Sequence, residues 1–121
     1  MKLTLPYPPS ANRYWRNFRG RMVVSAEARA YKRRVAGIFI QERPAPFIGV
    51  VNVRIAVYRP QRRGDLDNTL KVLLDSLKGL AYDDDDQIVS IAATRHDDKA
   101  NPRAEIEIEL MDGAQLALAT K

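Results

Sequence analysis

The 121-residue chain contains no cysteine and only one histidine, His96. A zinc site draws about three protein ligands mainly from Cys and His, so zinc chemistry is close to excluded. Disulfides and a cysteine nucleophile are excluded as well. Any bound metal is therefore expected to be a hard cation, Mg²⁺ or Mn²⁺, held by carboxylates.

Long apolar runs are also missing. No stretch approaches the roughly 20 apolar residues that span a bilayer, and no signal-peptide pattern follows Met1. We therefore expect action in the cytoplasm, with no membrane partner and no small-molecule cofactor. The composition, 45% hydrophobic and 29% charged, suits a single domain over residues 1–121, with a frayed or disordered tail from Met111 to Lys121.

Acidic residues are scarce in the first half of the chain. Residues 1–63 contain fourteen Lys or Arg against Glu27 and Glu42, a net charge of +12. Residues 64–121 contain six Lys or Arg against thirteen Asp or Glu, a net charge of −7. This division fits a protein that neutralises a polyanion with one surface and collects a metal ion with another. A basic surface that is merely solvated is the alternative interpretation.

Two stretches have the periodicity of amphipathic helices. Ser25 is the expected N-cap of the first helix, which should end before Pro44 and Pro46. Its apolar stripe would consist of Ala28, Tyr31, Val35, Ile38 and Phe39. The second helix should end at Gly79, a natural C-terminal cap. Its apolar face would consist of Leu66, Leu70, Leu73, Leu74 and Leu77.

Four strands are predicted from alternating polarity and from the positions of prolines. They are Lys2 to Leu5, Val51 to Tyr58, Gln87 to Thr94 and Arg103 to Leu110. Residues 13–21 are expected to form a basic, aromatic loop. The short connection between the last two strands favours an antiparallel pair. The order strand, helix, strand, helix, strand, strand predicts an α+β fold with one mixed, largely antiparallel sheet packed against two helices.

Two aspartates stand at the start of the second predicted helix. Asp65 and Asp67 flank Leu66, and Lys71 should lie one helical turn after Asp67. The acidic run Asp83 to Asp86 follows the helix and is expected to fold back towards its start. Carboxylates around a hard cation, with a lysine beside them, are what phosphodiester hydrolysis requires. Taken singly, each residue is more often a helix cap, an ion-pair partner or part of a solvated loop, but together they favour catalysis.

Arginines precede these aspartates and fill the predicted N-terminal loop. Guanidinium groups bind phosphates bidentately, and aromatic faces can stack on exposed bases. The arginines expected to bind DNA are Arg13, Arg16, Arg19, Arg21, Arg62 and Arg63, with Arg59 beside the last two. Tyr14, Trp15 and Phe18 lie among them, and the sequence leaves open whether these rings contact DNA or the core.

An ordered series of short motifs extends along the chain to about Leu110. It comprises Leu5-Pro6-Tyr7-Pro8-Pro9-Ser10, Asn12-Arg13-Tyr14, Arg19-Gly20-Arg21, Ser25-Ala26-Glu27, Tyr31, Asp65-Leu66-Asp67-Asn68, Lys71, Asp75 and an aspartate pair shortly before Gln87. In this order the motifs resemble the RusA family of Holliday junction resolvases. Members of that family are small homodimeric endonucleases of bacteria and their prophages.

The resemblance implies paired, magnesium-dependent nicking of four-way DNA junctions in recombination and repair, with Mn²⁺ as a substitute for Mg²⁺. It implies a metal-binding carboxylate triad at Asp65, Asp67 and Asp85 and a catalytic lysine at Lys71. Because four aspartates are consecutive, Asp84 is the next choice for the third carboxylate. A four-way junction is two-fold symmetric, so a homodimer would present two active sites to equivalent strands.

Two other functions stay open. The stretch Asp65-Leu66-Asp67-Asn68-Thr69 also matches the nucleophile motif of haloacid dehalogenase-type aspartyl phosphatases. Only about fifty residues follow it here, too few for several further βα units. The other alternative is a branched-DNA-binding module that does not cut, against which the joint presence of Asp65, Asp67, Asp85 and Lys71 argues.

Overall fold

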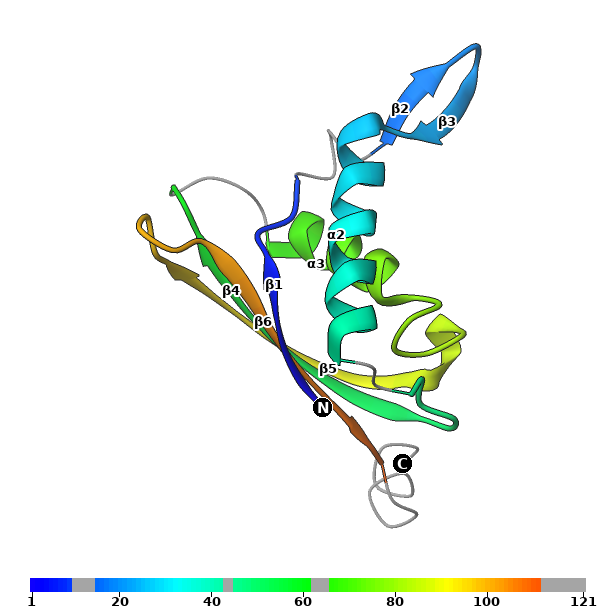
Figure 1. Ribbon diagram of the computed structural model, residues 1–121, viewed down its shortest axis with the longest axis vertical. Coiled ribbons are helices and arrows are strands. Elements are labelled where there is room, and N and C mark those ends of the chain that lie inside the picture. The colour runs from blue at the N-terminus through cyan, green and yellow to red at the C-terminus, as the bar shows by residue number, and fades with distance from the viewer. Residues whose placement is uncertain (10–14, 43–44, 62–65, 112–121) are drawn as a thin grey trace.

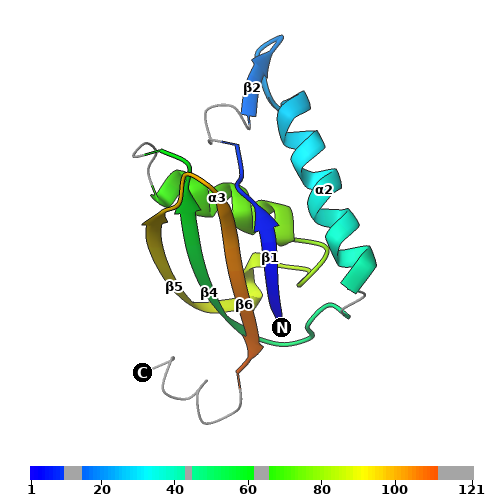
Figure 2. The ribbon, with the colours of Figure 1, turned by 60° about the vertical axis from the view of Figure 1, so that its left-hand side comes forward.

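The computed structural model describes residues 1–9, 15–42, 45–61 and 66–111, so the predicted tail after Met111 lies outside the described residues. In chain order the elements are β1 (Lys2–Pro6), β2 (Trp15–Phe18), β3 (Arg21–Val24), α2 (Ala26–Glu42), β4 (Val51–Arg59), α3 (Leu66–Leu77), the 3-10 helix η1 (Asp85–Gln87), β5 (Ile88–Asp97) and β6 (Arg103–Leu110). Four strands form one sheet in the order β1-β6-β4-β5, and β2 pairs with β3 alone. Both long helices lie on the same face of the sheet (Figures 1 and 2). The predicted α+β fold with a mixed sheet is confirmed.

Both predicted helices are present, and their apolar faces pack against the sheet. The amide of Ala28 donates to Ser25 Oγ at 3.1 Å, which is the expected N-cap. Every residue of the predicted α2 stripe is buried except Ile38, which is half-buried. After α3, Gly79 has a φ of 87°, in the left-handed region that a C-terminal cap uses. No helix within the described ranges is long and apolar enough to cross a membrane.

A salt bridge and a buried phenol fix the position of α3. Lys32 Nζ lies 3.0 Å from Asp75 Oδ2, which links α2 to α3. The Tyr82 hydroxyl donates to the Leu74 carbonyl at 2.8 Å, and the same carbonyl accepts from the Lys78 amide at 3.2 Å. Burial raises the pKa of the Tyr82 phenol well above its ordinary value, and nearby Asp85 adds to the rise, so the hydroxyl remains a neutral donor. The segment after α3 is therefore held against the C-terminal end of the helix.

β4 is an inner strand of the sheet and supplies much of the core. Its inward residues Val51, Val53, Ile55 and Val57 are no more than 3% exposed, as the alternating pattern predicts. β4 pairs antiparallel with β6 and parallel with β5. The predicted antiparallel pairing of the last two strands is therefore wrong, because β4 lies between them. Burying the strongly apolar β4 inside the sheet outweighs the short connection from β5 to β6.

Residues 15–24 form a hairpin instead of the predicted loop. β2 and β3 pair antiparallel around the two-residue turn Arg19-Gly20. Both turn residues have positive φ, 51° and 77°, as a type I′ turn requires. An arginine at the first turn position is uncommon because a Cβ disfavours that conformation, which makes this turn hard to recognise in the sequence. The hairpin projects beyond the N-terminal end of α2 (Figure 1).

The β4-α3-β5 crossover separates the start of α3 from the start of β5. β4 and β5 run parallel, with Val51 paired to Ile88 and Arg59 paired to Asp97. The chain therefore leaves β4 at Arg59 and returns along α3 to start β5 beside Val51 (Figure 1). A strand of nine residues spans roughly 27 Å. The start of α3 and the start of β5 are consequently far apart in one chain.

Candidate active site

The predicted carboxylates lie near opposite ends of α3. The backbone of Asp67 is in the first turn of α3, whereas Asp65 and the Asp67 side chain lie outside the described part of the protein. Asp85 begins η1, and its Oδ2 is 3.8 Å from Nζ of Lys78, the residue that follows α3. Asp67 and Lys78 are separated by roughly 16 Å along the helix axis. Within one chain, the acidic loop therefore does not fold back to the start of α3 as expected.

Lys71 lies on the exposed side of α3. Its neighbours Val72 and Leu73 are fully buried, whereas Lys71 itself is exposed. No salt bridge between described residues involves Lys71. The spacing from Asp67 puts both residues on the same face, one turn apart. An exposed ammonium in this position is available to an anionic ligand at the start of α3.

Gln87 anchors the acidic loop with its side-chain amide. Its Oε1 accepts from the amides of Asp83 and Asp84 at 2.8 and 3.0 Å. Its Nε2 donates to the carbonyls of Phe47 and Gly49, each at 2.8 Å. These four hydrogen bonds use the full capacity of the amide group. Gln87 therefore joins the acidic loop to the segment before β4, a role whose sequence signal is the capping pattern Asp-x-x-Gln.

The structure distinguishes Asp84 from Asp85. Asp84 is the N-cap of η1, and its Oδ1 accepts from the Asp86 amide at 3.0 Å. Asp85 is exposed, and among the described residues its ion-pair partner is Lys78, at 3.8 Å. A carboxylate that caps a helix is already engaged with backbone amides. Asp85 is therefore the freer of the two to bind an external ligand.

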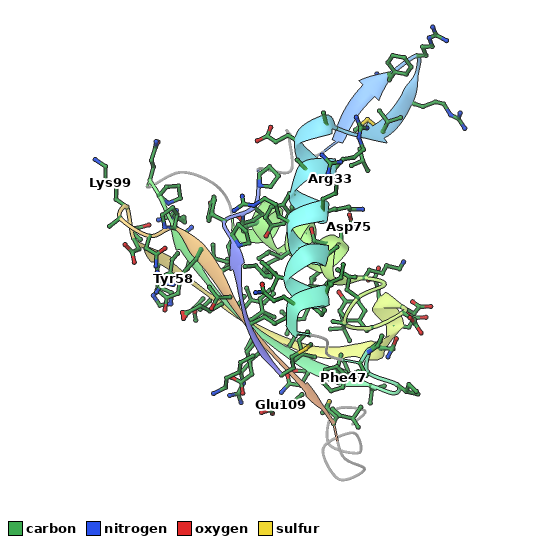
Figure 3. The ribbon with its side chains drawn as sticks, in the orientation of Figure 1. Arg33, Phe47, Tyr58, Asp75, Lys99 and Glu109 are labelled. Carbon is green, nitrogen blue, oxygen red and sulfur yellow. The ribbon has the colours of Figure 1, made fainter. Side chains whose placement is uncertain are left out.

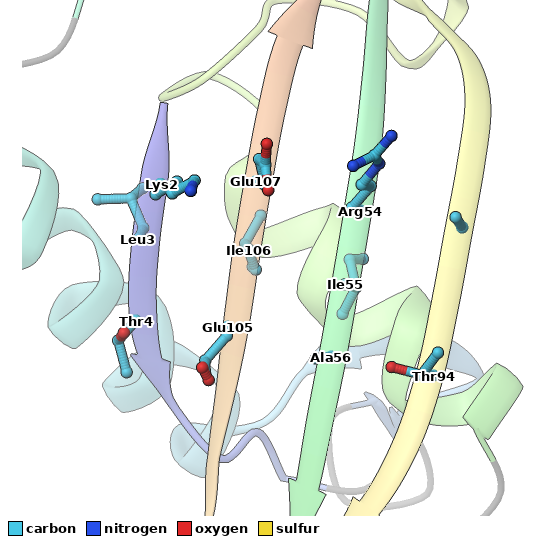
Figure 4. Close-up of a pocket in the computed structure, with 11 residues that line it drawn as sticks. Lys2, Leu3, Thr4, Arg54, Ile55, Ala56, Thr94, Glu105, Ile106 and Glu107 are labelled. Carbon is cyan, nitrogen blue, oxygen red and sulfur yellow. The ribbon is translucent and has the colours of Figure 1, made fainter.

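The outer face of the sheet carries charges that balance one another. Glu107 on β6 pairs in register with Lys2 on β1 and with Arg54 on β4. These residues line a groove of about 530 Å³ on the face away from the helices (Figure 4). Opposite charges on neighbouring strands stabilise a sheet. Because these charges cancel, the groove has little net attraction for a polyanion.

In the described ranges, no three Asp, Glu or His side chains group to hold a metal ion.

Ionic and ring contacts fix the end of β4 that leads to the predicted aspartates. Arg59 Nε lies 2.8 Å from Asp97 Oδ1, and the Arg59 side chain is only 12% exposed. The Arg103 guanidinium lies 3.8 Å from the centre of the Tyr58 ring, and the His96 ring stacks on the Tyr58 ring with 4.8 Å between the ring centres. Arg59, grouped in the sequence with arginines expected to bind DNA, is therefore engaged in holding the sheet together.

Several exposed arginines lie on the hairpin and on α2. Arg19 and Arg21 are exposed on the hairpin, as expected of DNA contacts. Arg29, Arg33 and Arg34 are exposed along α2, and Figure 3 labels Arg33 among them. The other arginines predicted to bind DNA lie outside the described residues, namely Arg13, Arg62, Arg63 and the side chain of Arg16.

Comparison with known proteins identifies the family. Residues 6–109 match the family model of endodeoxyribonuclease RusA. The chain belongs to the RusA family. The crossover junction endodeoxyribonuclease RusA of Escherichia coli strain K12 is 40% identical over 114 residues, covering 90% of this chain and 93% of that protein. The RusA protein of Enterobacteria phage 82 has the same identity and coverage.

A third relative, the RusA protein of Escherichia coli O139:H28, is 44% identical over 91 residues, covering 72% of this chain and 74% of that protein. The RusA family is one of enzymes that cleave phosphodiester bonds in DNA. Membership in it argues against the aspartyl phosphatase alternative and indicates a requirement for a divalent metal ion.

We predict that Gln87→Ala releases the acidic loop, because four hydrogen bonds lose their side-chain partner. The free energy of unfolding should fall by about 2 kcal/mol, measured by urea denaturation. The amides of Asp83 and Asp84 should exchange with D₂O about tenfold faster. Gln87→Glu keeps the oxygen that accepts from those amides but loses the donor to Phe47 and Gly49, so it should retain more protection. Wild-type exchange rates in Gln87→Ala would contradict the anchoring role.

Proposed function

We propose that the chain is a crossover junction endodeoxyribonuclease that resolves four-way DNA junctions by paired nicking, in recombination and repair. The observation that carries this proposal is the RusA match over residues 6–109, which spans all four predicted site residues. Relatives from Escherichia coli and from a phage carry that name. Since the substrate is cellular or phage DNA, the protein would act in the bacterial cytoplasm.

We propose Mg²⁺ as the metal ion, with Mn²⁺ able to replace it. The donors at Asp65, Asp67 and Asp85 are carboxylate oxygens, the ligands that hard cations prefer. When bound, such an ion neutralises phosphate charge and makes a bound water more acidic. Lys71, one turn after Asp67, would hold its ammonium against an oxygen of the scissile phosphate as negative charge develops there.

The separation of the carboxylates along α3 supports a site shared between two chains. Asp85 pairs with Lys78 beyond the C-terminal end of α3, whereas Asp67 is in the first turn. We infer that Asp85 of one chain completes the metal site begun by Asp65 and Asp67 of the other. A two-fold homodimer then has two such sites, one for each of two equivalent junction strands.

β5 is the surface best suited to join the two chains. It is an edge strand of the sheet, and residues 88–94 carry no charge. Val89 and Ile91 on this strand are 37% and 46% exposed. Edge strands with an uncharged stretch of this length are usually covered or paired, because their free amides and carbonyls attract another strand. Antiparallel pairing of two β5 strands about a two-fold axis would satisfy both edges.

This pairing would bring the acidic loop to the partner's α3. Asp85 lies in η1, directly before the start of β5. The end of β5 lies beside the end of β4, where Asp97 pairs with Arg59. From Arg59 the chain continues to α3 and Asp67. Antiparallel pairing sets the start of one β5 beside the end of the other. The carboxylates of Asp85 and Asp67 from different chains would then meet.

Incubation with a synthetic four-way junction and Mg²⁺ tests the proposed activity, and we expect symmetric paired nicks that EDTA abolishes. Asp67→Asn should bind the junction at least as tightly as wild type, because losing a carboxylate reduces repulsion of phosphate. Its nicking rate should fall by at least about 100-fold. Binding without nicks by wild type would favour a non-cutting module, and unchanged cleavage by Asp67→Asn would remove this residue from the mechanism.

Ile91→Asp tests the β5 interface, because a charge on an edge strand disfavours pairing with another strand. We expect a folded monomer in analytical ultracentrifugation, with nicking reduced about 100-fold since each site lacks its third carboxylate. Ile40→Asp is the matched control, because Ile40 is 72% exposed and lies on α2, away from β5. A dimeric, fully active Ile91→Asp protein would locate the interface elsewhere.

A further inference from the structure

The β2–β3 hairpin presents an exposed aromatic ring at its tip. Phe18 ends β2 and is 51% exposed, and it is not among the residues packed against the core. The guanidinium carbon of Arg19 lies 5.3 Å from the centre of the Phe18 ring, within cation–π distance. The hairpin projects away from the sheet and from α3 (Figures 1 and 2). Packing in the core therefore does not explain the presence of a phenylalanine at this position.

The Phe18 ring also lines a hollow between the hairpin and the start of α2. The hollow has a volume of about 360 Å³, and its other walls are Val23, Val24, Ala26 and Arg29. Arg29 Nη1 donates to the Val24 carbonyl at 3.0 Å, which fixes the cationic wall. Ligand pockets usually measure about 300–1,000 Å³, so this hollow suits a small ligand such as one flat ring system.

The surroundings of this hollow are strongly cationic. Residues 15–24 contain no Asp or Glu. Arg19 and Arg21 are exposed on the hairpin, and Arg29 is exposed on α2, where the acidic residue nearest in sequence is Glu27. Guanidinium groups around an apolar slot with an aromatic wall are suited to stack a nucleobase and bind its flanking phosphates. Charge thus favours a nucleic acid over an apolar segment of another protein.

The turn beside Phe18 holds its arginine in an unfavourable backbone conformation. Arg19 has a φ of 51°, a value that glycine or asparagine adopts more readily. The arginine contributes a guanidinium over the Phe18 ring that neither of those residues would supply. A backbone outlier that carries a charged side chain to an exposed ring is typical of a binding site.

We propose that this hollow receives an unstacked DNA base at the branch point of a junction, with Phe18 as its stacking partner and Arg19 and Arg21 on the adjacent phosphates. The inference rests on the proposed function. Base stacking is interrupted where strands exchange, so a base leaves the stack there at lower cost than within a duplex. Phe18 is a specificity-determining residue that favours junction over duplex DNA, and it takes no part in cleavage.

The first test compares the ratio of junction to duplex affinity in three variants. Phe18→Ala should reduce that ratio about tenfold, the effect of losing one stacked base, and Phe18→Tyr should retain it. Met22→Ala is the matched control, because Met22 is 69% exposed on the same hairpin but does not line the hollow. It should leave the ratio unchanged. Thermal melting should show that all three variants fold, since neither side chain is in the core.

The second test places 5-iodouracil at the branch point and irradiates the complex. A crosslink should map to the peptide containing Phe18, disappear in Phe18→Ala, and be absent when the probe is placed in a duplex arm. If wild type nicks junctions but Phe18→Ala keeps full junction preference without a crosslink, this inference alone is overturned. A wild-type protein that neither prefers nor nicks junctions overturns the proposed function as well. If Phe18→Ala has a lower mass than wild type in sedimentation but an unchanged junction preference, the hollow contacts a second chain. That result also overturns the inference.

Discussion

The parallel pairing of β4 with β5 is the constraint that determines where the predicted site residues lie. Parallel neighbours need a crossover connection, so the chain runs from the end of β4 through α3 back to the start of β5. Asp67 is thereby placed at one end of α3 and Asp85 at the other. Tyr82 and Gln87 hold the acidic loop at its end through hydrogen bonds. Moving Asp85 to Asp67 within one chain would break these hydrogen bonds, whereas in the proposed dimer a second chain would supply the third carboxylate without that rearrangement.

The division of charge along the sequence corresponds to a division in space. Pro6 at the end of β1 and Tyr58 near the end of β4 both pair in register with Arg103. The chain segments that lead to the basic hairpin and to α3 therefore leave the sheet at the same end. The acidic loop lies at the opposite end, before β5. In a dimer built on β5, the acidic loop of each chain would approach the end of the partner's sheet from which the partner's basic hairpin and α3 emerge. Phosphate binding and metal binding would then come together only when the dimer assembles.

The parts of the fold that depend on local pattern could be predicted from the sequence. The α2 stripe, the Ser25 cap and the alternation of β4 follow from spacing and propensity, and each is present. The neighbours of β5 could not be predicted, because a period of two shows which face is buried but not which strand lies alongside. The hairpin is hard to recognise in the sequence because Arg19 occupies a turn position where glycine or asparagine is expected. For the candidate site, the residue types and the Asp67–Lys71 spacing stay predictions from the sequence, whereas the position of Asp85 depends on the direction of β5.

The most direct test of a site shared between chains is to mix two variants that are inactive alone. Asp67→Asn and Asp85→Asn homodimers should each fail to nick a four-way junction. After subunit exchange, a heterodimer would combine an intact Asp67 from one chain with an intact Asp85 from the other in one site, while its second site carries both substitutions. A shared site predicts that the mixture recovers nicking of a single strand. Heterodimers shown by native mass spectrometry to have formed, yet unable to nick the junction, would contradict it.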